Sequence, residues 1–166
     1  MRKIIYSIAL LVLCLFNGSV FAQGVQQLWG TTTGGGTDGL GAIISASANG
    51  TNYQLRSSFN YTAQGRIPLY SDLIYYNSKM YGMTSEGGTN NAGVIFEWDP
   101  ATNNYTKKID LTSSNGYFPR GSLLLYNNKM YGMTISGGTN GAGVIFEWDP
   151  ATNIYTKNIE LTSSIG

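Results

Sequence analysis

The sequence predicts an all-β protein built from tandem units, each a blade of four antiparallel strands. Two nearly identical segments, residues 80–114 and 130–164, follow each other at a spacing of about fifty residues. Charged residues make up only 11% of the chain, whereas 22 glycines and 12 tyrosines are present. Few straight-chain helix formers remain, and no segment after the first shows helical periodicity. The pattern therefore favours short strands and turns.

The first 22 residues are predicted to be a signal peptide. Arg2 and Lys3 precede an apolar run from residue 4 to residue 16, and Val20 and Ala22 are the small residues that signal peptidase requires. The run is too short for a membrane span, so we expect none after the signal is removed. Cleavage after Ala22 predicts a secreted or cell-surface protein. Lipid attachment at Cys14, the only cysteine, is the alternative.

The repeats divide the rest of the chain, residues 23-166, into three units. About 29 of 35 positions are identical between 80–114 and 130–164, and a diverged copy starts at Leu28. Repeats of this length are typical of arrays in which each unit packs on its neighbours. We place a partial blade at 23-66, a full blade at 67-116 and a full blade at 117-166.

The last unit shows how each blade is predicted to be built. Its four strands are expected at 122–126, 129–134, 142–148 and 154–161. A tight turn at Asn127-Asn128 joins the first two strands, and Asp149-Pro150 begins the turn before the fourth. Consecutive apolar residues at 94–96 fit a middle strand that is covered on both faces.

The repeat resembles two known families. The motif LYNNKMYG, a glycine loop and FEWDPATNxYTK resemble a kelch repeat, although Trp98 and Tyr105 exchange the kelch positions of tyrosine and tryptophan. The WGTT of residues 29–32, the GGT loops and the aromatic-x-x-Asp pattern resemble the GloVer tandem repeat of secreted bacterial proteins more closely. The resemblance implies an exported, kelch-like β-propeller array. It implies no particular activity.

The array is expected to be incomplete, with about 2.75 blades. The first unit has no match for the first strand of a blade, whereas propellers close with about four to eight blades. We therefore expect further copies in the gene. An open array leaves blade faces exposed, so the chain alone is expected to associate or aggregate.

Several kinds of chemistry are excluded by composition. Histidine is absent and the only cysteine lies in the signal, which excludes Ser-His-Asp triads, Cys-His dyads and the usual zinc sites. We predict no catalytic residue, no cofactor and no metal. Once the signal is removed, eight basic and nine acidic residues remain, so the net charge is slightly negative and nucleic-acid binding is not expected.

Glu97 and Asp99, which Glu147 and Asp149 repeat, are spaced like a glycosidase pair. A catalytic pair is needed once, whereas a structural device recurs in every unit. We interpret Asp99 and Asp149 as turn residues.

The ligand-facing candidates lie in the three glycine loops. The loops also fit a purely structural role that needs positive φ angles. Most aromatic side chains are expected between blades, and Tyr75, Tyr76 and Tyr117 are candidate surface aromatics. The candidate residues are Thr37, Asp38, Thr89, Asn90, Thr139 and Asn140.

The predicted function is a non-catalytic binding or interaction module of an exported bacterial protein. Near-identical units would offer the same surface several times, to a glycan or a surface protein. Two alternatives stay open from the sequence: a fragment of a polysaccharide-active propeller enzyme whose catalytic residues lie in other blades, and a structural spacer.

Overall fold

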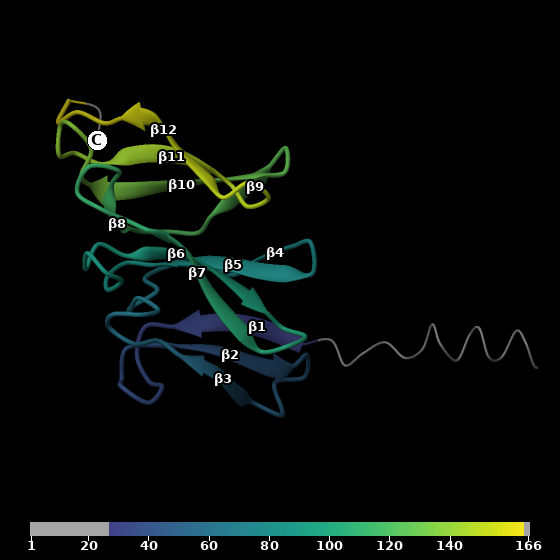
Figure 1. The fold of residues 1–166 in the computed structure, drawn as a ribbon. Helices are drawn as coiled ribbons and strands as arrows, with labels where there is room; N and C mark the ends of the chain where they lie inside the picture. Colours follow the sequence, from purple (N-terminus) through teal and green to yellow (C-terminus); the bar gives the residue numbers. More distant parts are fainter. Residues whose placement is uncertain (1–26, 165–166) are drawn as a thin grey trace, which may run out of the picture.

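A computed structural model of the chain describes residues 27–164 as three antiparallel sheets stacked face to face (Figure 1). The first sheet contains β1 (Gln27–Thr32), β2 (Ala42–Ser47) and β3 (Gln54–Ser58). The second contains β4 (Ile74–Tyr76), β5 (Lys79–Thr84), β6 (Val94–Asp99) and β7 (Asn104–Asp110). The third contains β8 (Tyr117–Pro119), β9 (Leu124–Tyr126), β10 (Lys129–Ser136), β11 (Val144–Asp149) and β12 (Ile154–Glu160).

The fold class predicted from the sequence is confirmed. Each unit is an antiparallel sheet whose strands, apart from β8, pair in chain order, as in a propeller blade, and the three sheets form an open array. Within residues 27–164 no helix is long and apolar enough to cross a membrane. The predicted signal peptide lies outside the described residues.

Turn chemistry sets the strand boundaries. Asn127 and Asn128 both have positive φ, 49° and 62°, which is the conformation of a type I′ hairpin turn. Asp149 Oδ1 accepts a hydrogen bond of 2.8 Å from the backbone N–H of Ala151. Asp99 Oδ1 accepts the equivalent bond of 2.9 Å from the backbone N–H of Ala101. The predicted role of both aspartates as turn residues is therefore confirmed.

The middle strands bury both of their faces. Val94, Phe96 and Trp98 of β6 belong to a cluster with Phe59 against the first sheet, whereas Ile95 packs in a second cluster against the third sheet. Because side chains alternate along a strand, β6 sends successive residues into the two junctions. This explains the consecutive apolar residues that the sequence shows.

An aromatic contact marks the junction between the second and third sheets. The Tyr81 ring meets the edge of the Trp148 indole with 5.6 Å between ring centroids. Both side chains are buried, and Met83 and Met130 belong to the same cluster. The expectation that aromatic residues pack between blades is met at this junction.

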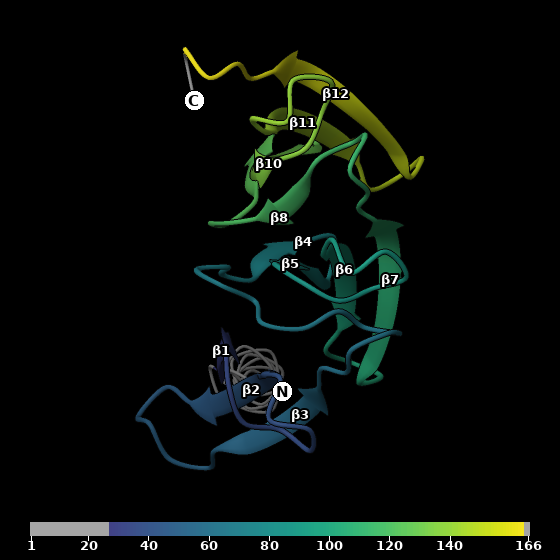
Figure 2. The same ribbon diagram turned by 90° about the vertical axis from the view of Figure 1, so that its left-hand side faces the viewer.

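A connecting segment runs from each sheet to the next and lies between them (Figure 2). The segment after β7 contains β8, which the sequence did not predict. Thr134 and Ser136, at the far end of β10, pair with Pro119 and Tyr117 of β8. The near end of β10 pairs with β9. The third sheet therefore has five strands, because the short strands β8 and β9 both pair with the longer strand β10.

Backbone bonds hold the connecting segments in an unusual conformation. Ile67 and Phe118 each precede a proline and have φ angles of 54° and 55°, which residues other than glycine rarely adopt. The N–H of Phe118 donates to Ala92 O at 3.0 Å, and that of Ile67 donates to Leu40 O at 2.9 Å. The same bond in two repeats indicates a structural cause for the conformation.

A partly buried tyrosine in the last strand of the second sheet, and another in the last strand of the third, each fix the preceding connecting segment. The Tyr155 hydroxyl donates to Asn115 O at 2.7 Å, and the Tyr105 hydroxyl donates to Gln64 O at 2.5 Å. Burial raises the pKa of both tyrosines well above the usual range, so both stay neutral donors. The hydroxyls therefore satisfy carbonyl groups of segments 40 and 41 residues away.

We predict that a methyl group at Gly132 destabilises the fold. A Cβ there would lie 2.4 Å from Cζ of Phe146, which stacks on Tyr155. Because the ring is enclosed, Gly132→Ala should lower the free energy of unfolding by about 1–3 kcal/mol, measured by urea denaturation. Gly30→Ala is the matched control, since a Cβ at Gly30 meets no atom within 4 Å. Equal stability of G132A and the wild type would contradict this packing.

Candidate functional site

The six candidate residues lie in three equivalent loops, which join β1 to β2, β5 to β6 and β10 to β11. Their threonines hold the loops to the last strand of each sheet. The N–H and Oγ1 of Thr89 donate to the two oxygens of Asp110, each at 2.9 Å. The N–H of Thr139 donates to Glu160 at 2.8 Å, and that of Thr37 donates to Ser58 Oγ at 3.0 Å.

In two of the three repeats a lysine also pairs with the carboxylate that holds the loop. We call the threonine, the carboxylate and the lysine the loop clamp. Lys107 Nζ lies 2.5 Å from Asp110 Oδ2, and Lys157 pairs with Glu160. Burial raises the pKa of Asp110, but hydrogen bonds from Lys107 and Thr89 outweigh it and lower the pKa overall. Hydrogen bonds from Lys157 and Thr139 lower the pKa of Glu160 to about 2. Both carboxylates are therefore ionised at neutral pH.

The glycines of the loops have the structural role that the sequence left open. Gly88 has a φ of 76°, and a Cβ there would lie 2.5 Å from Asp110 Oδ1. Gly138 has a φ of 74°, and its Cβ would lie 2.8 Å from Val144. Positive φ and close approach thus both require glycine. The three candidate threonines also support loop structure, through their hydrogen bonds to the last strand of each sheet.

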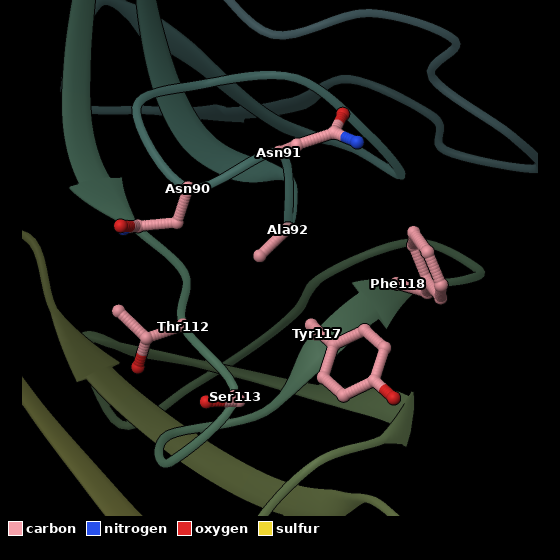
Figure 3. A pocket seen from close by; sticks show the side chains of 7 residues that line it. All are labelled: Asn90, Asn91, Ala92, Thr112, Ser113, Tyr117 and Phe118. Atoms are coloured by element: carbon pink, nitrogen blue, oxygen red, sulfur yellow. The ribbon is translucent and has the colours of Figure 1, made fainter.

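A cleft of about 310 Å³ opens beside the second glycine loop (Figure 3). One wall comes from this loop, and the other comes from the connecting segment between the second and third sheets. Only Asn90 among the six candidates lines it, and Tyr117, one of the three expected surface aromatics, lines the opposite wall. Of the other two, Tyr75 is exposed, but Tyr76 was wrongly expected at the surface, since it packs against the core between the second and third sheets. The lining residues are Asn90, Asn91, Ala92, Thr112, Ser113, Tyr117 and Phe118.

The cleft offers neutral polar groups beside two aromatic rings. None of its lining residues carries a charge. The Asn90 side-chain N–H donates to Leu111 O at 3.0 Å, which leaves its carbonyl oxygen as an acceptor. The Asn91 carbonyl oxygen accepts from the Gly87 N–H at 3.1 Å, which leaves its amide N–H groups as donors. The Tyr117 and Phe118 rings lie edge to face at 4.8 Å.

A second cleft, of about 370 Å³, lies between β1 and the first connecting segment. Tyr70 and Asp72 line it together with Thr31, whose hydroxyl donates to Ser71 O at 2.7 Å. The Asp72 carboxylate accepts a hydrogen bond of 2.9 Å from Ser122. This cleft therefore contains a carboxylate and differs in chemistry from the first.

Three of the four carboxylates of the repeated pairs, Glu97, Asp99 and Glu147, are engaged in ion pairs. Lys79 lies 2.5 Å from Asp99, and Lys108 lies 3.6 Å from Glu97. A hydrogen bond from Lys79, followed by one from Thr102, holds the pKa of Asp99 far below its usual range. In the third sheet Glu147 pairs with Lys129. Among residues 27–164 no three acidic or cysteine side chains gather in a group that could hold a metal ion.

We predict that Glu160 stabilises the fold only while it is ionised. Its folded pKa of about 2 lies below the ordinary value of 4.5, so its contribution is complete above pH 4.5. The contribution is lost as the pH falls through the folded pKa. The stability difference between the wild type and Glu160→Gln should therefore shrink steadily from pH 4.5 toward pH 2, measured by chemical denaturation at each pH. A stability difference that is independent of pH over this range would contradict the role of Glu160 in the loop clamp.

Comparison with known proteins identifies the repeat. No curated protein matches the chain. Among solved structures, the tricorn protease is similar with a TM-score of 0.46 and 16% identity, and the match covers 81% of this chain and 11% of the protease chain. The model of the Gloeobacter/Verrucomicrobia repeat matches residues 16–166, which confirms the resemblance to GloVer repeats. The chain therefore belongs to the Gloeobacter/Verrucomicrobia repeat family.

Proposed function

We propose that the chain is a non-catalytic repeat module that binds a neutral carbohydrate in the cleft between its second and third sheets. The observation that carries this proposal is the lining of the cleft. Uncharged amide and hydroxyl groups stand beside the rings of Tyr117 and Phe118. Small-ligand sites combine apolar and aromatic walls with a few polar groups that fix orientation.

The size and charge of the cleft support a neutral sugar over an ionic ligand. Its volume of about 310 Å³ lies at the lower end for small-ligand sites, which are roughly 300–1,000 Å³. The face of a sugar ring carries C–H groups that pack on an aromatic ring, and the hydroxyl groups project from the edge of the sugar. The acceptor of Asn90 and the donors of Asn91 match such hydroxyl groups, whereas an ionic ligand would meet no opposite charge.

The surface location of the binding module is part of the same proposal. Arg2, Lys3 and the apolar run that ends at Phe16 support export, with cleavage after Ala22. Binding of an extracellular glycan at the bacterial cell surface fits this location. Ion pairs engage the carboxylates at positions 97, 99, 110, 147 and 160. Because these carboxylates are already paired with lysines, binding of a glycan is favoured over its hydrolysis.

A glycan array with the purified chain tests the proposal, followed by titration of the best ligand. Tyr117→Ala should weaken binding about tenfold or more, because it removes a ring from the cleft wall; a factor of ten corresponds to about 1.4 kcal/mol. Tyr117→Phe keeps the ring and should retain most of the affinity. Tyr75→Ala is the matched control, since Tyr75 is exposed and outside the cleft.

Thermal unfolding of each variant separates loss of binding from loss of fold. Unchanged affinity in a folded Y117A variant would place the ligand elsewhere. Binding to a surface protein with no glycan bound, or turnover of a polysaccharide, would overturn the proposed function.

A further inference from the structure

The third sheet exposes a face that is the repeat equivalent of a buried one. The residues of this face stand fifty positions after residues that pack in the junction between the second and third sheets. We call them the outer face of the third sheet: Leu124, Tyr126, Met133 and Ile159, which are exposed, and Tyr131 and Ile145, which are half-buried. Their counterparts in the junction are Tyr81, Met83 and Ile95, which are buried, and Ile74, Tyr76 and Ile109, which are partly buried.

The side chains at these two sets of positions are almost the same, but their burial differs. Met83 is 1% exposed, whereas Met133 is 50% exposed. Ile109 packs against the core of the junction, whereas Ile159 is 48% exposed. The chain therefore carries the same apolar face twice, and in the second sheet that face seats a neighbouring sheet.

The opposite end of the array has a complementary exposed face. In the second sheet, Met80, Phe96 and Trp98 point toward the first sheet. Their repeat equivalents in the first sheet, together with Leu55 of β3 and Tyr53, which directly precedes β3, form what we call the outer face of the first sheet: Leu28, Ile44, Ala46, Tyr53 and Leu55. Of these, Leu28, Tyr53 and Leu55 are between 52% and 63% exposed.

We propose that two copies of this chain associate head to tail, with the outer face of the first sheet of one copy on the outer face of the third sheet of the other. The two internal junctions already stack sheets with this polarity, so the contact continues an existing interface. Exposed apolar faces of this kind mark interaction sites. A head-to-tail contact between identical units forms either a ring or a filament. Two copies of residues 27–164 contain six sheets, a number that lies within the four to eight blades of closed propellers.

The polar groups on the outer face of the third sheet do not oppose this contact. Tyr131 donates to Glu147 at 2.8 Å, and Glu147 pairs with Lys129. At the internal junction Tyr81 also stands near a carboxylate, since burial and the charge of Glu97 both raise the pKa of Tyr81. A tyrosine near a carboxylate is thus accommodated where two sheets already pack together.

The contact between copies should be weaker than the internal junctions. Ile44 and Ala46 stand where the second sheet has Phe96 and Trp98, so the first sheet presents smaller side chains. Less apolar area is then removed from water. We therefore expect association that depends on protein concentration.

Light scattering on a size-exclusion column, run at several concentrations of the purified chain, tests the proposal. The wild type should shift from monomer to dimer as the concentration rises. Met133→Lys and Leu28→Lys should each remain monomeric, because each places a charge in one half of the contact. Tyr70→Lys is the control, since Tyr70 is 75% exposed and lies in the first connecting segment. It should dimerise like the wild type.

Mixing the two face variants distinguishes head-to-tail packing from a symmetric contact. Each variant keeps one intact face, so an equimolar mixture of M133K and L28K should form a one-to-one dimer although neither associates alone. Near-UV circular dichroism should show that both variants are folded. A wild type that stays monomeric at every concentration, or dimers of L28K alone, would overturn the proposal.

Discussion

The structure depends on the fact that one of these sheets cannot bury its own apolar residues. A single antiparallel sheet has two faces, and the middle strand β6 carries large apolar side chains on both. Each face is removed from water only when another sheet lies on it, which is the condition that makes repeat arrays quasi-one-dimensional. Stacking is therefore the source of stability in this chain, and the rest of the repeat is arranged to permit it.

Close approach between sheets requires a connecting segment without side chains at its tightest points. A Cβ at Gly116 would lie 2.6 Å from both Thr134 and Val144, and one at Gly65 would lie 2.1 Å from Thr84. The buried hydroxyls of Tyr105 and Tyr155 then satisfy carbonyl groups of these segments. The same features bring each segment beside the glycine loop of the preceding sheet. The cleft with Asn90 and Tyr117 is thus a consequence of how the sheets are joined.

The sequence was sufficient to predict what is local in each repeat and insufficient for what forms between repeats. Alternation and turn residues such as Asp149 and Asn127 identified the fold class and most strands, because these signals act within a few residues. Strand β8 was missed because its pairing partner in β10 is set by the connection between sheets, and its three residues show no pattern. For the same reason the sequence identified Asn90 but not the role of Thr112 or Ser113 in the cleft.

Neighbouring repeats pack face to face through their aromatic and aliphatic side chains. Nuclear Overhauser spectroscopy on the folded chain, with selectively labelled tyrosine and tryptophan, measures this packing directly. We expect strong cross-peaks between the Tyr81 ring and the Trp148 indole, whose centroids lie 5.6 Å apart. A spectrum in which Trp148 has contacts within its own repeat but none to Tyr81 or Met83 would contradict the stacked arrangement.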